Sequence, residues 1–299
     1  MSKAKIQNNI MLNTKHLRLI STLLIPSLFC VGCSAYEVKP LSENSKRVAK
    51  AFEKAKVKPQ IKYYAVGDRN IATLQIGADS LPITVLLHGS PGAGADYDAY
   101  LMDSSLYLQS KIIVIDRPGY GFSDFGKAEL SIMKQADIIQ NVVEQIDSTA
   151  NLYFVGFSYG GPVAARLAMT MANRTKGLLL LSASVAPGEE KTFGISYTIK
   201  LKNWTNKLPI MLRLANEEKL SHKVALEAML NDWKMITAPV WMLHGTEDGL
   251  IYFTNTAFAK KMLTNAKLEI VPVEGKGHGF FFSEKALITK YLKEMMNYK

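Results

Sequence analysis

Cysteine is scarce in this sequence: only Cys30 and Cys33 occur among the 299 residues. A disulfide between them would close a loop too small to staple a fold. No second group of ligands accompanies the pair, so a metal or redox site is not favoured. Apolar runs of about 18 residues, which a membrane-spanning helix needs, are also missing, and this argues against a polytopic membrane protein. With 48% hydrophobic and 21% charged residues, the composition indicates a globular chain rather than a disordered one.

Acidic residues are absent from positions 1–36, and the same segment carries four basic residues, Lys3, Lys5, Lys15 and Arg18. A mostly apolar stretch spans residues 17–31, and small residues follow it around Cys33. This order of basic, apolar and small residues is typical of an export signal.

Residues 30–33, Cys-Val-Gly-Cys, resemble the bacterial lipobox, whose last cysteine is acylated and becomes the new N-terminus. Gly32 supplies the small residue before the acceptor, whereas Cys30 follows the bulky Phe29. The resemblance implies a signal peptide at 1–32, lipidation at Cys33, and an exported protein anchored to a membrane surface, on the periplasmic face of the outer membrane if the source has two membranes. The alternative is cleavage after Ala35, which would release a free periplasmic or secreted protein. Met11 is an alternative start.

The net charge is +10. Removal of residues 1–32 leaves 32 basic against 26 acidic residues, a net charge of +6 that favours an anionic membrane surface. No basic-aromatic stripe or recognition motif occurs, so no nucleic-acid partner is predicted. The Lys-rich residues 33–60 are interpreted as a tether between the anchor and a domain at 61–299.

Short apolar runs then alternate with helical patterns. A 3.6-residue period with Ser131 as N-cap predicts a helix near 132–146, and further helices are expected at 160–172 and 284–297. Continuous apolar runs indicate strands buried on both faces. We expect strands at 61–66, 71–76, 83–87, 111–115, 152–155, 178–181, 239–243 and 268–271. This pattern predicts an α/β fold with a doubly wound, mostly parallel eight-stranded sheet.

Residues 186–237 interrupt the alternation. The apolar residues at 195, 197, 199 and 201 alternate, which favours a strand, whereas 210–214 and 224–233 favour helices. We predict a mainly helical insertion. Its large apolar side chains either line an acyl pocket or pack the insertion onto the core; they are Phe193, Tyr197, Trp204, Ile210, Met211 and Trp233.

The motif Gly156-Phe-Ser-Tyr-Gly160 follows a predicted strand and opens a predicted helix. A G-x-S-x-G motif in this context presents a strained serine hydroxyl at a sharp turn, so Ser158 is the candidate nucleophile. The serine needs a base, and in this fold the order is Ser, acid, His. His278, between two glycines after the last strand, meets that order.

The acid is expected after the strand at 239–243, where Asp248 is favoured over Glu247 and, more remotely, Glu274. An acyl-transfer site also needs donors for the oxyanion. The backbone N–H groups of Tyr159, at the start of a helix, and of Ser90, in the glycine-rich loop 88–94, are the candidates.

Five segments together resemble the α/β-hydrolase superfamily: 88–92 (HGSPG), 116–123 (DRPGYGFS), 156–161 (GFSYGG), 245–248 (GTED) and 277–280 (GHGF). The resemblance implies a Ser158–His278–Asp248 triad, an oxyanion hole at Ser90 and Tyr159, and a lid at 186–237. It makes Asp116 a structural turn residue.

The expected activity is hydrolysis of a carboxylic ester or related acyl bond of a small substrate, in the manner of a carboxylesterase, with no cofactor and no metal. One alternative is a prolyl-aminopeptidase-like enzyme acting on short peptides, in which Glu217 and Glu218 would meet the substrate amine unless they form a solvated helix face. Others are a C–C hydrolase, an acyltransferase or a perhydrolase on the same triad. A non-catalytic binding lipoprotein is the remaining alternative.

Overall fold

The computed structural model describes residues 52–53, 57–201 and 207–298, with the side chains of 199–201 left out. The predicted signal peptide at 1–32, the lipidation site at Cys33 and Trp204 lie outside these ranges. Within them, no helix combines the length and the apolar character that crossing a membrane requires.

One eight-stranded sheet forms the centre of the described domain. Its strand order is β1-β2-β4-β3-β5-β6-β7-β8, with antiparallel pairing of β1 with β2 and of β2 with β4 and parallel pairing from β4 to β8. The strands are β1 (Gln60–Val66), β2 (Arg69–Ile76), β3 (Ile83–Leu87), β4 (Lys111–Ile115), β5 (Leu152–Phe157), β6 (Thr175–Leu181), β7 (Val240–Gly245) and β8 (Leu268–Val273).

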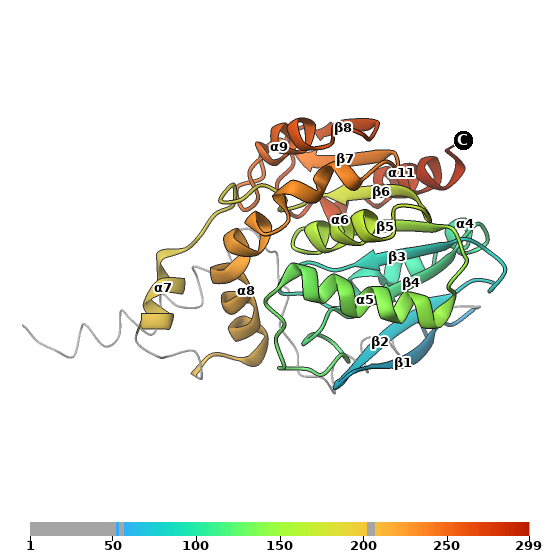
Figure 1. The fold of residues 1–299 in the computed structure, drawn as a ribbon, viewed down its shortest axis with the longest axis horizontal. Coiled ribbons are helices and arrows are strands. Elements are labelled where there is room, and N and C mark those ends of the chain that lie inside the picture. Colours follow the sequence, from blue (N-terminus) through green and yellow to red (C-terminus); the bar gives the residue numbers. More distant parts are fainter. Residues whose placement is uncertain (1–51, 54–56, 202–206, 299) are drawn as a thin grey trace, which may run out of the picture. The chain divides into compact units, whose positions relative to one another are not determined.

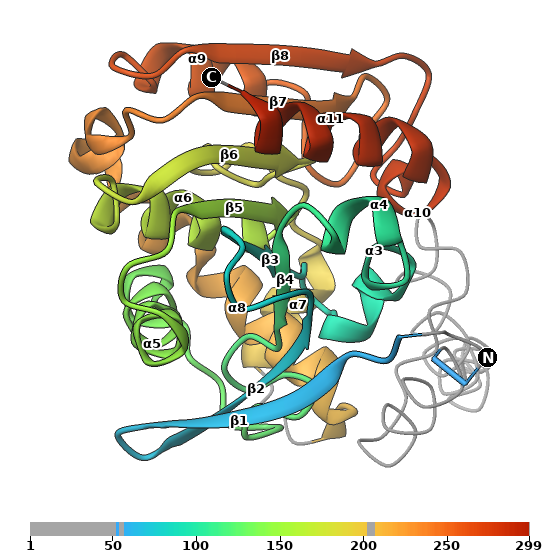
Figure 2. The ribbon, with the colours of Figure 1, turned by 90° about the vertical axis from the view of Figure 1, so that its right-hand side faces the viewer.

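Helices cover both faces of this sheet (Figure 1). The α-helices are α3 (Asp98–Leu101), α4 (Ser104–Tyr107), α5 (Ile132–Ile146), α6 (Gly160–Thr170), α7 (Gly194–Leu201), α8 (Ile210–Glu227), α9 (Asn255–Met262), α10 (Phe280–Ser283) and α11 (Lys285–Asn297), and the 3₁₀ helices are η1 (Gly94–Tyr97) and η3 (Leu230–Met235). Helices α5, α6 and α9 bury apolar residues on one face, and α3, α4, α10 and α11 do so on the other, as Figure 2 shows from the side.

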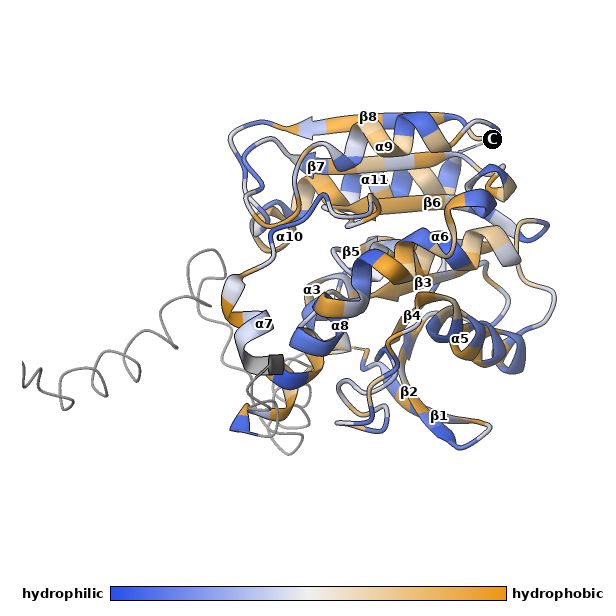
Figure 3. Cartoon of the chain, turned by 60° about the vertical axis from the view of Figure 1, so that its left-hand side comes forward, coloured by the Kyte–Doolittle hydropathy of each residue, from blue (hydrophilic) through white to orange (hydrophobic). Residues whose placement is uncertain are grey.

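The predicted fold class is confirmed, because every expected strand is present and differs at its ends by at most three residues. The strands were recognisable because they are buried on both faces and therefore lack polar alternation. Figure 3 shows the resulting concentration of hydrophobic residues in β6. The N-cap of α5 is also as predicted, since the Ser131 side chain accepts a hydrogen bond from the backbone of Lys134.

The segment between β6 and β7 is helical and lies beyond the carboxyl ends of the strands (Figure 1). The strand that the alternation at 195–201 favoured is wrong, because these residues form α7. Two of the large apolar side chains pack inward: Trp233 in the main core and Met211 against Tyr120 and Leu214. Tyr197 and Ile210 are exposed.

The start of the domain agrees with the expected residue 61 to within one residue, since β1 begins at Gln60. Phe52 lies inside the segment predicted to be a tether, yet its side chain is buried in the core on the face of α3, α4 and α11. The packed part of the chain therefore includes at least this one residue before β1.

Candidate active site

Ser158 occupies a tight turn between β5 and α6, with a left-handed backbone φ of +54°. Such a conformation is strained for a residue with a Cβ and persists only where the surroundings hold it. The flanking glycines explain how the turn fits. A Cβ at Gly156 would lie 2.4 Å from the carbonyl oxygen of Gly160, and a Cβ at Gly160 would lie 2.2 Å from that of Leu87. No other residue type allows this approach of backbone to backbone.

Three of the predicted site residues form one hydrogen-bonded chain. The Oγ atom of Ser158 is 3.0 Å from Nε2 of His278, and Nδ1 of His278 is 2.8 Å from Oδ2 of Asp248. Because the ionised carboxylate of Asp248 can only accept a hydrogen bond, Nδ1 of His278 carries the proton and donates it. Nε2 of His278 is then free to accept a hydrogen bond from the hydroxyl of Ser158. Phe157 stacks against the imidazole at a centroid distance of 5.1 Å and limits its rotation.

Asp248 is held as a carboxylate by its neighbours. Burial raises its pKa, but the hydrogen bond and charge of His278 and the backbone N–H groups of Ile251 and Leu250 outweigh burial, so the pKa lies below its usual value. The alternative acids Glu247 and Glu274 are both exposed. In the structure, Asp248 is the acidic residue bonded to His278.

Ser90 and Tyr159 line the same pocket as Ser158. Among the described residues, no hydrogen bond from the backbone N–H of either residue is found. Both N–H groups therefore remain open to hydrogen bonding by an oxygen atom that enters this pocket. The geometry thus brings together all five residues that the sequence singled out at 90, 158, 159, 248 and 278.

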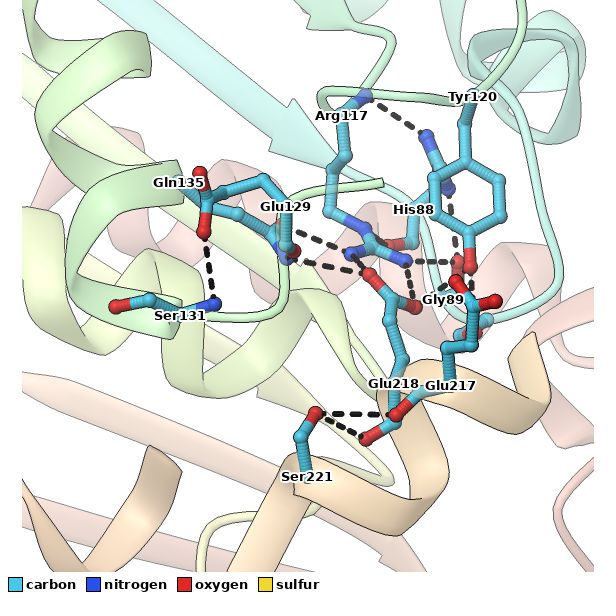
Figure 4. Close-up of polar contacts among 11 residues, drawn as sticks. His88, Gly89, Arg117, Tyr120, Glu129, Ser131, Gln135, Glu217, Glu218 and Ser221 are labelled. Carbon is cyan, nitrogen blue, oxygen red and sulfur yellow. Dashed lines mark hydrogen bonds and ion pairs between the residues drawn. The ribbon is translucent and has the colours of Figure 1, made fainter. Parts of the chain in front are cut away.

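A buried ion pair, which sequence reasoning did not anticipate, lies behind this loop. Arg117 and Glu218 form a bidentate contact with Nη1–Oε1 and Nη2–Oε2 distances of 2.7 and 3.2 Å, and their side chains are 0% and 1% exposed. The guanidinium also donates to the carbonyl oxygens of His88 and Gly89 at 2.9 Å each. Figure 4 shows Arg117 between these carbonyls and α8. Arg117 therefore connects the insertion to the loop that carries Ser90.

Glu218 has further partners around the guanidinium. The hydroxyl of Tyr120 donates to Oε2 at 2.6 Å, and Gln135 donates to Oε1 at 3.2 Å. The same Tyr120 hydroxyl is 3.0 Å from Oγ of Ser90. The side chain of Glu218 is buried, so the expectation that it forms a solvated helix face is wrong. Both of its oxygens are already hydrogen-bonded within the protein. The polar sequence of α8 does not indicate that Glu218 pairs with Arg117, because Arg117 lies on a loop that is distant in the sequence.

Several polar residues line the pocket beside Ser158. Four polar side chains from the insertion and its approach line it, namely Ser184, Glu190, Lys219 and His222. None of the described large apolar residues of the insertion that were considered for an acyl pocket lines it. The sequence analysis missed these polar residues, because their approach to Ser158 depends on where α8 packs.

The remaining described histidines away from the pocket have structural contacts. His88 accepts from the backbone N–H of Arg117 at Nε2 and contacts the carbonyl of Gly89 at Nδ1, and burial lowers its pKa well below the usual value. His244 donates to the carbonyl of Ile251. Asp116 accepts from the backbone N–H groups of Gly94 and Phe122 and so holds two turns together. His88, His244 and Asp116 therefore hold the loops around the site in place.

Among the side chains that the structure describes, no group of three or more His, Cys, Asp or Glu is arranged to hold a metal ion.

Comparison with known proteins agrees with this geometry. Residues 84–288 match the profile of the Alpha/beta hydrolase family. The AB hydrolase superfamily protein YisY of Bacillus subtilis is 24% identical over 250 residues, covering 71% of this chain and 91% of that protein.

Solved structures give the same fold. A lipase candidate from Acinetobacter baumannii AYE has a TM-score of 0.65 at 21% identity and covers 89% of this chain and 98% of its own. A membrane phospholipase A, a bacterial virulence factor, has 0.63 at 17%, with 96% and 100% covered. Carboxylesterase CesB of Bacillus subtilis has 0.62 at 14%, with 86% and 98% covered. At these identities the likeness is one of fold.

Proposed function

Because this chain belongs to the Alpha/beta hydrolase family, we propose that it is a serine hydrolase that cleaves a carboxylic ester of a small substrate through Ser158, His278 and Asp248. The observation that carries the proposal is the hydrogen-bonded chain from Ser158 Oγ through His278 to Asp248, with the serine held at a left-handed turn. A serine hydroxyl beside an oriented imidazole is the arrangement that nucleophilic catalysis of acyl transfer requires.

In the first half of the reaction, Ser158 Oγ attacks the ester carbonyl carbon and its proton passes to Nε2 of His278. The carbonyl oxygen becomes an oxyanion and accepts hydrogen bonds from the N–H groups of Ser90 and Tyr159. Collapse of this intermediate breaks the bond to the alcohol oxygen, which takes the proton from Nε2. An acyl group remains on Ser158. Asp248 stabilises the imidazolium while it carries both protons.

In the second half, a water molecule attacks the acyl carbon and His278 Nε2 takes the proton of that water. The second oxyanion uses the same two donors. When the intermediate collapses, Nε2 returns the proton to Ser158 Oγ and the carboxylic acid leaves. The enzyme is thus regenerated with no change in the charge of the triad.

Two observations favour a small ester. The cavity beside Ser158 has a volume of about 70 Å³, well below the range of roughly 300–1,000 Å³ that is usual for drug-sized ligands. Among proteins of the same fold, carboxylesterase CesB, naproxen esterase and an Exiguobacterium antarcticum esterase are named for ester cleavage. A thioesterase domain and a meta-cleavage product hydrolase of the same fold are named for other bonds, but esterases are the larger group among these neighbours, which supports an ester as the proposed substrate.

Covalent labelling tests the nucleophile directly. The full chain and its Ser158→Ala variant are treated with a fluorophosphonate probe and analysed by intact mass and peptide mapping. One adduct on Ser158 in the wild type, absent from the variant, is expected. Ser184→Ala is the matched control, because Ser184 lines the same pocket but its hydroxyl donates to Glu190. Adduct formation must persist in this control.

A folded wild type that takes no adduct would contradict the proposal and favour a non-catalytic binding protein. If the adduct forms, a panel of esters and proline anilides identifies the bond. Faster cleavage of the anilides would replace the esterase assignment with an aminopeptidase. Ester turnover that diverts to an added alcohol or to peroxide would indicate an acyltransferase or a perhydrolase. Cleavage of a carbon–carbon bond would indicate a C–C hydrolase.

We also propose that the protein is exported and anchored through a lipid on Cys33, on the strength of the basic, apolar and small residues that precede it. Labelled fatty acid is expected to enter the wild type and the Cys30→Ser variant but not Cys33→Ser. No incorporation in the wild type would favour cleavage after Ala35 and a free exported protein, and incorporation that persists in Cys33→Ser would contradict acylation of Cys33.

A further inference from the structure

The pocket beside Ser158 contains charged side chains that the proposed hydrolysis does not use. Glu190 lies in the connection after β6, whereas Lys219 and His222 lie on α8. The Nζ atom of Lys219 is 3.0 Å from Oε1 of Glu190. Two separate parts of the insertion therefore bring an ion pair to the wall of the candidate active site.

Glu190 is saturated with partners. Its side chain is 4% exposed. Besides Lys219 on Oε1, the hydroxyl of Ser184 donates to Oε2 at 2.8 Å, and Nε2 of His222 lies 3.5 Å from the same oxygen. Both carboxylate oxygens are thus engaged inside the protein. Glu190 acts as a fixed counter-ion rather than as an open receptor for a substrate cation.

Lys219 is not saturated. An ammonium group has three N–H donors, and within the described part of the chain Glu190 is the partner found for Lys219. The Lys219 side chain is 21% exposed, five times more than that of Glu190. Burial lowers the pKa of Lys219, while the charge and hydrogen bond of Glu190 oppose this and favour the protonated form. The charge that a ligand can reach in this pocket is therefore positive.

Stability alone does not account for this arrangement. Partly buried ion pairs contribute little net stability, because removing two charges from water offsets their attraction. Charged groups that burial perturbs in a cleft occur preferentially at functional sites. The position of this pair, in the pocket that holds the nucleophile, makes substrate recognition the function that its geometry fits.

We propose that Lys219 recognises a carboxylate of the substrate, so that the preferred substrates are small esters that carry one negative charge near the scissile bond, such as half-esters of dicarboxylic acids. The inference rests on the proposed ester hydrolysis and names its substrate class. Lys219 donates to the substrate carboxylate in a charge-assisted hydrogen bond. Glu190 is a positioning residue, because it holds the ammonium group toward the pocket.

The test compares matched esters. The 4-nitrophenyl half-esters of glutarate and adipate place a carboxylate on the acyl side. The neutral partners are the same 4-nitrophenyl esters with the free carboxylate converted to a methyl ester. The 3- and 4-acetoxybenzoates, with their methyl esters, place the carboxylate on the leaving group. The readout is the ratio of kcat/KM for each anionic ester to that for its neutral partner, after subtraction of the spontaneous hydrolysis measured without enzyme, so that general losses of activity cancel.

The wild type is expected to favour at least one anionic ester by about tenfold, in line with one charge-assisted hydrogen bond. Lys219→Met keeps the aliphatic stem and should reduce this ratio to about one, whereas Lys219→Arg should restore part of it. Lys223→Met is the matched control, because Lys223 lies one turn further along α8 with a 65% exposed side chain. Its ratio should equal that of the wild type.

With these esters, three results would overturn the inference: a wild type that does not prefer any anionic ester, a preference that survives in Lys219→Met, or an equal loss on both esters in that variant, which indicates a structural role. A preference for an ester bearing an ammonium group would assign recognition to Glu190 instead and would also overturn it. If the wild type takes the fluorophosphonate adduct and cleaves neutral esters, only the substrate class fails. If no ester is cleaved, calorimetric binding of the half-esters to Ser158→Ala decides, since loss of binding with Lys219→Met would still support recognition.

Discussion

Glu218 on α8 and Arg117 after β4 form a bidentate ion pair, and neither side chain is more than 1% exposed. The two residues are 101 positions apart in the sequence. Through the hydrogen bonds of Arg117 to the carbonyls of His88 and Gly89, this pair ties the insertion to the loop that presents Ser90. The position of the proposed oxyanion donor thus depends on a residue of the helical insertion.

Replacing Glu218 with alanine should destabilise the protein strongly, because the buried guanidinium of Arg117 would lose its counter-charge. The expected loss in the free energy of unfolding is about 3–5 kcal/mol, measured by urea denaturation. Glu217→Ala, at the neighbouring half-buried position, should change it by less than about 0.5 kcal/mol. A loss that is equally small at both positions would show that the ion pair does not stabilise the docking of α8.

Asp248→Asn should lower kcat for ester hydrolysis by about 10⁴-fold, as an amide in that position favours the wrong imidazole tautomer. The fold should remain, since the side chain keeps its size and one acceptor for the backbone N–H groups of Leu250 and Ile251. Glu247→Gln is the control at the exposed neighbouring carboxylate, and its kcat should match that of the wild type. Measurement of the burst of product before the steady state separates the rate of the chemical step from the rate of product release. Comparable activity in both variants would remove Asp248 from the proposed mechanism.

Asp116 should make stability depend on pH in the mildly acidic range. Burial raises its pKa to about 6, although the N–H groups of Phe122 and Gly94 oppose this. Between pH ~4, its ordinary pKa, and pH ~6 the folded state binds more protons than the unfolded state, so this group's contribution falls as pH rises. The change amounts to about 3 kcal/mol.

The measurement for Asp116 is the slope of unfolding free energy against pH in that window. Asp116→Asn cannot titrate, so its slope should be more positive than that of the wild type. Parallel slopes for the two proteins would show that Asp116 does not titrate in this range. The overall stability of the variant is not the readout, because the amide replaces a bond acceptor with a donor.

Gly160→Ala should disrupt the turn at Ser158. A Cβ there would lie 2.2 Å from the carbonyl oxygen of Leu87, and backbone atoms cannot move aside without displacing β3. Loss of activity and a drop in Tm of several degrees are expected, the latter in the range of about 2–4 °C per kcal/mol for a domain of this size. Gly194→Ala, at the start of α7, serves as control, because within the described part of the chain no atom beyond its two neighbours lies within 4 Å of the new methyl group. Thermal unfolding followed by circular dichroism checks both variants.

Many of the strands and helices could be predicted from the sequence. Eight short apolar runs became the eight strands, because strands covered on both faces have no polar side to show. The helix after Ser131 followed from a local cap and a 3.6-residue period. The alternation of apolar residues at 195–201 gave a wrong prediction, since these residues form α7. An alternating pattern favours a strand only where a sheet is available to pair with it.

The residues of the Ser158–His278–Asp248 chain could likewise be named in advance, as they follow predicted strands whose carboxyl ends meet at one edge of a parallel sheet. The surroundings of this hydrogen-bonded chain depend on the three-dimensional packing of α8. It buries Glu218 as the partner of Arg117, and it brings Lys219 to the pocket beside Glu190. Local patterns report which side of an element is buried, but the partner of a buried charge is set by contacts between distant segments. Those contacts exist only once the insertion has folded onto the sheet.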